Sequence, residues 1–280
     1  MRKISIKQID SLVKKLIFTA NFNLPLKVQK KLKNLHKTEK QALAKNTLKQ
    51  ITENFSLAAK EQLPLCQDTG VGIFFVKIGH QVLLEEPLQK TLDKALKKYY
   101  QEFYLRKSTL IEPLFNRKNT FDNLPAFLHL QQIEGNKLEI TFMPKGGGAE
   151  NKSALTMLSP SDGQKGIIDF VIKTVKKAGG SACPPLLVGI GIGGTFDSVA
   201  HLAKQAILKG IDYKNKDKNY LNLEQKLYEK LEKLKIGAMG RKGKKFLLGV
   251  NICQKPCHIA SLPLAVNLQC HSFRLAKGSI

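Results

Sequence analysis

The chain has 280 residues, of which 42% are hydrophobic, and this is enough for a sizeable core in one large domain or two of ordinary size. No run of about eighteen apolar residues occurs, so no membrane-spanning helix is predicted. The formal net charge of +24, from 46 Lys and Arg against 22 Asp and Glu, is compatible with a nucleic-acid-binding protein and with an enzyme of small anionic substrates.

The basic residues are mostly Lys scattered along helical stretches, such as 27–45 and 215–235. Few aromatic side chains that could stack on bases lie between them. This pattern indicates a solvated, Lys-rich surface, and nucleic-acid binding is kept as the alternative. The basic, amphipathic segment 1–18 is interpreted as the first helix, because it lacks the long apolar core and the small-residue cleavage site of a targeting peptide.

Helical spacing of apolar residues follows the chain in several blocks. Helices are predicted over 1–60 with a break at Pro25, and over 88–105, 161–180 and 215–235. Strands are predicted over 71–79, 136–148 (running into three glycines), 246–252 and 263–270. Residues 184–210 have the form of a buried strand, a glycine-rich turn and a helix, whereas 117–130 and 237–245 are predicted as a loop and a turn. Helices and strands are mixed throughout, which predicts an α/β or α+β fold.

The five cysteines are an odd number without a signal peptide or a CxxC spacing, which predicts a reducing, cytoplasmic environment and no disulfide framework. Three of them stand beside turn residues: Cys66 before Gln-Asp-Thr-Gly, Cys183 before Pro-Pro, and Cys270 before a histidine. Thiolates select iron–sulfur clusters or zinc, and three ligands would leave one iron of a four-iron cluster open. Spacing alone favours buried structural cysteines over a metal site, which is kept as the alternative.

Two glycine-rich stretches offer backbone N–H groups to an anion. "GIGIGGT" at 189–195 lies between a strand and a helix but fits neither a Walker loop nor a clean GxGxxG pattern, so carboxylate binding and tight packing both remain open. In "PKGGGAENKS" at 144–153 the three glycines would let a backbone approach a ligand closely, and Glu150, Asn151 and Lys152 supply polar groups.

Two further side chains are candidates for binding or proton transfer. His258 is flanked by Cys257 and Ile259 and could be a core histidine or a functional one. Arg106 follows a predicted helix, and a guanidinium can bind a carboxylate with two parallel hydrogen bonds.

Five motifs in this order, "CQDTG", "KGGGAENKS", "CPPLLVGIGIGGT", "PCHIASLPLAVN" and "QCH", resemble the class I (iron–sulfur) fumarate hydratases. The likeness is to the α subunit of their two-subunit form and runs over nearly the whole chain. It implies one iron–sulfur hydro-lyase α-subunit domain over 1–280, with a helical part over about 1–60, carrying a [4Fe-4S] cluster.

The resemblance also implies roles for particular residues. Cys66, Cys183 and Cys270 match the three cluster ligands, whereas Cys253 and Cys257 fall on no ligand position.

The residues that match the surroundings of a dicarboxylate substrate are Gln67, Asp68, Arg106, Gly147 and His258. Among them, Arg106 with backbone donors near Gly147 is expected to hold a carboxylate, and Asp68 and His258 are expected to orient the substrate or handle protons.

The implied reaction is the reversible hydration of fumarate to L-malate, with an open iron as Lewis acid. Family members take their carbon base, a threonine, from the second half of the enzyme, so a separate β subunit is expected as partner, in an α2β2 assembly. L-tartrate dehydratase, also a two-subunit enzyme of this family, is the alternative. The short tail "FRLAKGSI" and the charge of +24 depart from the family pattern.

Overall fold

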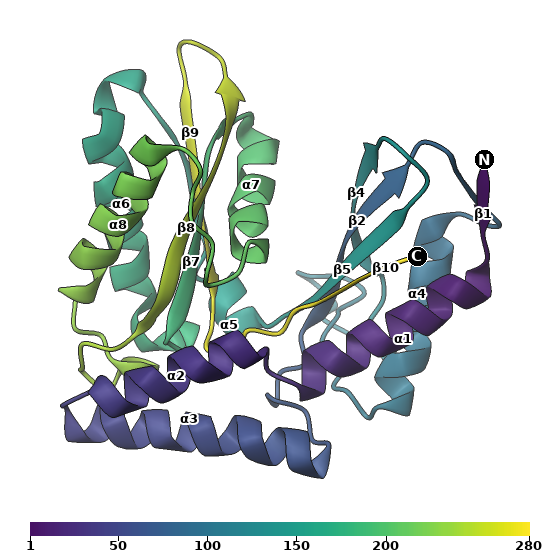
Figure 1. Cartoon of the computed structure of the whole chain (residues 1–280), viewed down its shortest axis with the longest axis horizontal. Coiled ribbons are helices and arrows are strands. Elements are labelled where there is room, and N and C mark those ends of the chain that lie inside the picture. The colour runs from purple at the N-terminus through teal and green to yellow at the C-terminus, as the bar shows by residue number, and fades with distance from the viewer. The chain divides into compact units, whose positions relative to one another are not determined.

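The computed structural model describes residues 1–280, which divide into two compact units (Figure 1). Unit 1 consists of Met1–Pro25, Phe55–Gly147 and Arg274–Ile280, and unit 2 of Leu26–Asn54 and Gly148–Phe273. Both units combine helices with a four-stranded sheet, which confirms the predicted mixed α/β fold. A single domain over 1–280 stays a prediction.

The sheet of unit 1 has the strand order β10-β5-β2-β4. Its strands are β2 (Val71–Gly79), β4 (Phe127–Ile133), β5 (Leu138–Lys145) and β10 (Ala276–Ser279). β2 lies between β5, to which it is antiparallel, and β4, to which it is parallel. A small parallel pair, β1 (Arg2–Ile4) with β3 (Val82–Leu84), completes the strands of this unit.

Two helices, α1 (Ile6–Phe22) and α4 (Leu88–Glu102), pack on each other, and α1 also packs against β5 and β10. Their apolar residues form one core with the sheet, and Phe74, Leu96 and Phe142 are fully buried in it. A Cβ at Gly72 would lie 2.8 Å from a methyl carbon of Leu96, so the glycine in β2 allows α4 to approach the sheet closely.

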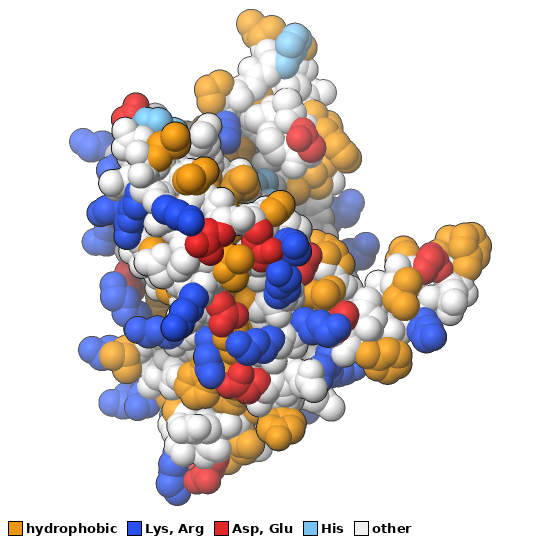
Figure 2. Space-filling model, turned by 90° about the vertical axis from the view of Figure 1, so that its right-hand side faces the viewer, with side chains coloured by type: hydrophobic (Ala, Val, Ile, Leu, Met, Phe, Trp, Pro, Cys, Tyr) orange, Lys and Arg blue, Asp and Glu red, His pale blue; other side chains and the backbone are white.

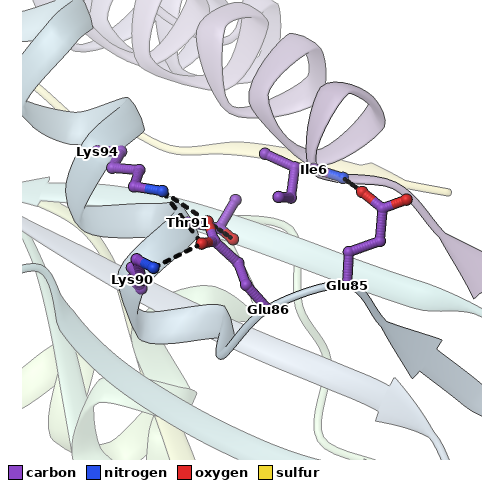
Figure 3. Close-up of polar contacts among 6 residues, drawn as sticks. All are labelled: Ile6, Glu85, Glu86, Lys90, Thr91 and Lys94. Atoms are coloured by element: carbon purple, nitrogen blue, oxygen red, sulfur yellow. Dashed lines mark hydrogen bonds and ion pairs between the residues drawn. The ribbon is translucent and has the colours of Figure 1, made fainter.

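Carboxylates stabilise the start of both helices (Figure 3). The backbone N–H of Ile6 donates to Glu85 Oε2 over 2.9 Å, which pairs the unsatisfied N-terminus of α1 with a negative charge. Beside the start of α4, Glu86 accepts hydrogen bonds from Lys94 and from the hydroxyl of Thr91, each over 3.0 Å. The Lys94 ammonium is the largest cause that lowers the pKa of Glu86.

The sheet of unit 2 has the order β6-β9-β7-β8. Its strands are β6 (Ala154–Leu158), β7 (Leu186–Gly194), β8 (Leu247–Cys257) and β9 (Leu262–Gln269). β7 runs parallel to β8 and antiparallel to β9. The start of β7 therefore lies beside the end of β9, and the end of β7 lies beside the turn that joins β8 to β9.

Helices cover both faces of this sheet. Figure 1 shows α6 (Gly163–Ala178) and α8 (Lys218–Glu232) on one face and α7 (Phe196–Leu208) on the other. The remaining helices and helical turns are α2 (Leu26–Thr38), α3 (Ala42–Glu61), α5 (Gly147–Glu150), η1 (Pro160–Asp162), η2 (Gly179–Ala182) and η3 (Ala238–Gly240). None of the helices has both the length and the apolar character needed to cross a membrane.

The glycines of "GIGIGGT" belong mostly to β7 and serve close packing. A Cβ at Gly191 would overlap the carbonyl oxygen of Val199 and lie 2.8 Å from the backbone nitrogen of Ala203, both in α7. Gly189 meets the next turn of the same helix in the same way. The backbone of α7 thus lies directly on β7, which favours tight packing over carboxylate binding for this stretch.

Replacing Gly191 by Ala is expected to destabilise the protein by roughly 1–3 kcal/mol, because backbone atoms of α7 cannot move aside as a side chain can. Urea unfolding measures the change. Gly249→Ala on the neighbouring strand is the matched control, since its Cβ would meet the Leu187 side chain at 3.2 Å and no close backbone atom. Equal effects of the two substitutions would contradict this account.

Three predicted boundaries differ from the structure. Residues 117–130 were expected as one loop, but β4 begins at Phe127, because parallel pairing with β2 orders this segment. The first 60 residues hold three helices and also the short strand β1. The short strands β6 and β10 were missed, since each is held by pairing with a strand distant in sequence.

Candidate active site

The segment "CQDTG" lies in unit 1, just before β2. Asp68 Oδ1 accepts a hydrogen bond from the backbone N–H of Gly70 over 3.0 Å, which closes a tight turn. Gly70 has φ +73°, and a Cβ there would lie 2.6 Å from the backbone of Lys145. Only glycine fits this combination of backbone conformation and close approach.

Asp68 also connects two of the predicted site residues directly. Its Oδ2 accepts a hydrogen bond of 2.8 Å from the backbone N–H of Gly147, in the "KGGGAENKS" motif. The structure therefore brings Asp68 and Gly147 together although they are 79 positions apart. Gln67 and Gly147 are exposed beside this bond, and Asp68 is half-buried.

Arg106 is held near the same turn through its backbone. The hydroxyl of Thr69 donates to the carbonyl of Arg106 over 2.8 Å, while the Arg106 side chain is exposed to solvent. The amide of the fully buried Asn123 donates to the carbonyl of Gly70 over 3.1 Å and so fixes the other end of the loop that begins at Arg106. The exposed guanidinium is thus carried on an anchored backbone.

Tyr100 lies under this turn and was not predicted from the sequence. Its hydroxyl donates to the carbonyl oxygens of Thr69 and Gly70 over 3.1 and 3.2 Å. Burial raises the pKa of Tyr100 strongly, the positive charge of Arg274 lowers it and the negative charge of Asp68 raises it. The phenol is therefore a neutral donor that supports the turn.

Arg274 is the other residue of this region that the sequence did not single out. It follows the "QCH" motif by three residues, and its side chain is only 2% exposed. Its Nε and Nη1 atoms are buried and have no hydrogen-bond partner. Only its position four residues after the candidate ligand Cys270 could have indicated from the sequence that Arg274 lies near the site.

In unit 2, Cys183 and Cys270 are connected through His271. The backbone N–H and the Nδ1 atom of His271 both lie within hydrogen-bond distance of the carbonyl oxygen of Cys183, at 3.2 and 3.0 Å. Cys183 adopts a left-handed backbone conformation, with φ +55°, at the end of η2. Both thiols are half-buried, and no cysteine of the chain is in a disulfide bond.

The surroundings of Cys270 fit a bound group. Gln269 Oε1 and Ser272 Oγ are buried without a hydrogen-bond partner on either side of this cysteine. A Cβ at Gly148 would lie 3.9 Å from Cys183 Sγ, so this glycine of the "KGGGAENKS" motif lies beside that thiol. Soft sulfur donors next to unsatisfied polar atoms fit an iron–sulfur cluster. Cys66, the third predicted ligand, is a half-buried residue of unit 1.

The other two cysteines belong to β8. Burial raises the pKa of the Cys253 thiol, which makes it a poor nucleophile and a poor ligand. Cys257 donates to the carbonyl of Ser261 over 3.3 Å in the exposed turn between β8 and β9. Cys257 pairs with Gly194 at the end of β7, opposite to the end near Cys183.

His258 lies in the same exposed turn, where its Nδ1 accepts a hydrogen bond of 3.1 Å from the backbone of Ala260. The whole of β9, from Leu262 to Gln269, separates it from Cys270. Eight residues of strand correspond to a distance on the order of 25 Å. Within one chain, the structure does not bring His258 to Cys183 and Cys270.

Two polar residues of "KGGGAENKS", Glu150 and Ser153, are bonded within unit 2. Glu150 Oε2 accepts from the amide of Asn267 over 2.8 Å, and the same amide contacts Ser153 Oγ over 2.8 Å. Glu150 Oε1 pairs with Lys204, whose side chain is largely buried. These bonds attach the motif to β9 and α7, so Glu150 has a structural role here.

Comparison with known proteins places nearly the whole chain in one family. The family described as "Fumarate hydratase (Fumerase)" matches residues 10–279, and the chain belongs to it. A protein of Methanocaldococcus jannaschii, provisionally named L(+)-tartrate dehydratase subunit alpha, is 42% identical over 276 residues, which cover 96% of each chain. The L(+)-tartrate dehydratase subunit alpha of Escherichia coli and that of Shigella sonnei are each 31% identical, over 92% of this chain and 86% of theirs.

Proposed function

We propose that the chain is the α subunit of an iron–sulfur hydro-lyase that adds water reversibly to fumarate to give L-malate. Its membership of the fumarate hydratase family supports the reaction class. The structural observation that carries the proposal is the attachment of Cys183 to the residue after Cys270, beside buried polar atoms without partners.

In this proposal Cys66, Cys183 and Cys270 hold a [4Fe-4S] cluster. When bound, such a cluster supplies an iron without a protein ligand, which acts as a Lewis acid toward the hydroxyl and carboxylate oxygens of the substrate. The thiols must be deprotonated to bind, so loading of the cluster releases protons.

Unit 1 supplies the residues that bind and orient the substrate. The exposed guanidinium of Arg106 is free to bind a carboxylate by two parallel hydrogen bonds, and the exposed amide of Gln67 lies on the same turn as Asp68. Each oxygen of Asp68 already accepts one backbone N–H, which fixes the carboxylate in one orientation. Each oxygen keeps a second lone pair that can accept a proton or a hydroxyl group of the substrate.

A partner β subunit is part of the proposal. The relatives from E. coli and S. sonnei carry names that mark them as α subunits, which supports a second kind of chain in the assembly. In the iron–sulfur fumarate hydratases that this chain resembles, the carbon base comes from the second half of the enzyme, which is the β subunit in the two-subunit form. The α chain alone is therefore expected to bind the cluster but not to turn over substrate.

The position of His258 supports two copies of the α chain in the assembly. His258 is expected to contact the substrate, yet the length of β9 keeps it away from Cys270 of its own chain. If both residues serve one site, His258 must come from a second copy. An α2β2 assembly with a two-fold axis between the α chains satisfies this condition.

The names of similar proteins support a second candidate for the substrate. The similar α chains of known proteins are named for L-tartrate rather than fumarate. Both substrates are four-carbon dicarboxylates, and both reactions remove or add water next to a carboxylate. L-tartrate dehydratase is therefore the second candidate.

The test is an assay of the α chain co-expressed with its β subunit and purified without oxygen. We expect about four irons per α chain, and a kcat/KM for fumarate hydration well above that for L-tartrate dehydration. A higher kcat/KM for L-tartrate would select the second candidate. A complex that holds iron but acts on neither substrate would contradict the proposal.

Nucleic-acid binding, the alternative based on charge, is not favoured. Figure 2 shows Lys and Arg side chains spread over the displayed face with Asp and Glu between them, rather than gathered in one patch. Many lysines are engaged in ion pairs on the surface, such as Lys14 with Glu102 over 2.7 Å. A basic surface with carboxylates interspersed attracts small anions through its net positive field.

A further inference from the structure

A hairpin of unit 1, formed by residues 107–121, exposes several large apolar side chains close together. Single exposed apolar residues are common on protein surfaces, whereas a group of them on one element marks a surface for another protein. Each of the four residues concerned is more than half exposed to solvent. They are Ile111 (67%), Leu114 (67%), Phe115 (91%) and Phe121 (73%).

The two arms of the 107–121 hairpin are joined by backbone hydrogen bonds. The N–H of Ile111 donates to the carbonyl of Lys118 over 2.9 Å, and the N–H of Thr120 donates to the carbonyl of Thr109 over 3.0 Å. These bonds order the hairpin without any burial of its apolar side chains. A surface that is already ordered loses less conformational entropy when a partner binds to it.

The tip of the hairpin is ordered by one carboxylate. Glu112 accepts hydrogen bonds from the backbone N–H groups of Leu114, Phe115 and Asn116, over 2.5 to 2.6 Å. The N–H of Asn116 is the largest cause that lowers the pKa of Glu112. The backbone that carries the two most prominent apolar side chains, Leu114 and Phe115, is therefore held in one conformation.

The base of the hairpin is attached to the turn that carries the predicted substrate residues. Asn123, which is fully buried, accepts the N–H of Ser108 over 2.7 Å and donates to the carbonyl of Gly70 over 3.1 Å. Gly70 ends the turn of Gln67 and Asp68, and Arg106 directly precedes the hairpin. The hairpin is thus an ordered extension of this part of the candidate site.

This position indicates which chain the hairpin contacts. In the proposed function the carbon base comes from the β subunit, so the β subunit must reach the substrate beside Gln67, Asp68 and Arg106. A chain that approaches these residues lies next to the hairpin that begins at the following residue. The apolar side chains are where such a chain gains most from excluding water.

The charge of the hairpin favours a different chain over a second copy of the same one. The segment 107–121 contains Lys107, Arg117 and Lys118 against Glu112 alone, and the carboxylate of Glu112 is bonded to its own backbone. A second α chain would bring a further net charge of +24. A partner surface with acidic residues around an apolar pocket complements the hairpin best.

We propose that the 107–121 hairpin is the element of the α chain that docks onto the β subunit. Its apolar tip fills an apolar pocket of that subunit, and its basic residues face acidic ones at the rim. The inference rests on the proposed function, because that function requires a β subunit at this site.

The first test removes the apolar tip. In the double variant Leu114→Ala/Phe115→Ala, the backbone bonds to Glu112 stay in place, so the Tm of the α chain should be unchanged. The Kd of the α/β complex, measured by light scattering over a dilution series without oxygen, should rise on the order of 100-fold. Leu43→Ala, at an exposed position of α3 in unit 2, is the matched control and should leave the Kd unchanged.

The second test reverses one charge beside the tip. Lys118→Glu should raise the Kd on the order of 10-fold at low ionic strength and less at high ionic strength, because salt screens interactions between exposed charges. Lys233→Glu, at an exposed position of unit 2, makes the same charge change away from the hairpin and should have a much smaller effect. At concentrations that keep every α chain bound, KM and kcat of both hairpin variants should equal those of the wild type.

The outcomes distinguish this inference from the proposed function. A wild-type complex that forms but acts on no dicarboxylate overturns the proposed function, and the Kd of the double variant then decides the docking inference alone. An active wild-type complex with an unchanged Kd in the double variant overturns the inference alone. An unchanged Kd with loss of the α–α contact would assign the hairpin to a second copy, and an unchanged Kd with a raised KM would assign it to the substrate site; both overturn the inference.

Discussion

Replacement of Cys270 by Ser is expected to remove the cluster and with it nearly all hydro-lyase activity. A serine hydroxyl is a harder and much less acidic ligand than a thiol, so two thiolates would have to hold the cluster alone. We expect the activity of the α/β complex to fall below about 1% of wild type, with a matching loss of the visible absorbance of the cluster. Iron per chain and absorbance, both measured after anaerobic purification, are the direct readouts.

Cys253→Ser is the matched control for this prediction. Cys253 is a half-buried cysteine of the same unit, but it lies in β8, away from the end of the sheet where Cys183 and Cys270 meet. Its variant should keep its iron and most of its activity, with only a small loss of stability from burying a hydroxyl. A Cys270→Ser complex that retains iron and activity, or a Cys253→Ser complex that loses both, would contradict the assignment of the ligands.

Measurements of folding show whether Cys270→Ser affects only the cluster or also the structure of the chain. Because His271 rather than the thiol joins this segment to Cys183, the polypeptide should remain folded without the cluster. Circular dichroism should be close to that of the wild type, and the β subunit should still co-purify. Unfolding of the variant would mean that the cluster is required for folding, as in small metal-dependent domains.

Much of the fold could be predicted from the sequence, because the segments with periodic apolar residues are long. The helix expected over 88–105 is α4, and the strand expected over 71–79 is β2, since apolar spacing and glycine boundaries decide these elements locally. β6 and β10 were not predictable in this way. Each is a short edge strand, five and four residues long, that is ordered only by its distant partner.

The candidate site shows the same division between local and distant effects. The turn of "CQDTG" follows from Asp68 and Gly70 themselves, and a sequence pattern can indicate it. The bond from Gly147 to Asp68 and the burial of Arg274 depend on how distant segments meet. The roles of "GIGIGGT" could not be separated from sequence because glycine serves close packing and ligand approach equally well, and only the position of α7 on Gly191 decides between them.

A mixture of two inactive α chains is expected to recover activity if each site draws residues from two copies. The first chain carries His258→Asn, which keeps an acceptor for the backbone N–H of Ala260, and the second carries Cys270→Ser. Each variant alone should have very low activity. In a mixed dimer, one site would contain both changes and the other site neither.

The expected recovery follows from counting the sites. Random assembly makes about half of the dimers mixed, and each mixed dimer has one intact site, so the mixture should reach about a quarter of the wild-type activity. Co-expression with two different affinity tags, followed by purification through both, would isolate the mixed dimer and raise its activity to about half. The mass of the complex should correspond to two α and two β chains.

The contrary results are equally informative about the geometry. The mixture could stay inactive although mixed dimers form and the His258→Asn chain binds iron. His258 and Cys270 of different copies would then not share a site, and His258 would lie outside the site of Cys270. Full activity of His258→Asn alone would remove this residue from the site. Recovery of activity would instead explain why a residue expected at the substrate lies at the opposite end of the sheet from two cluster ligands: the two-fold assembly, rather than the single chain, completes the site.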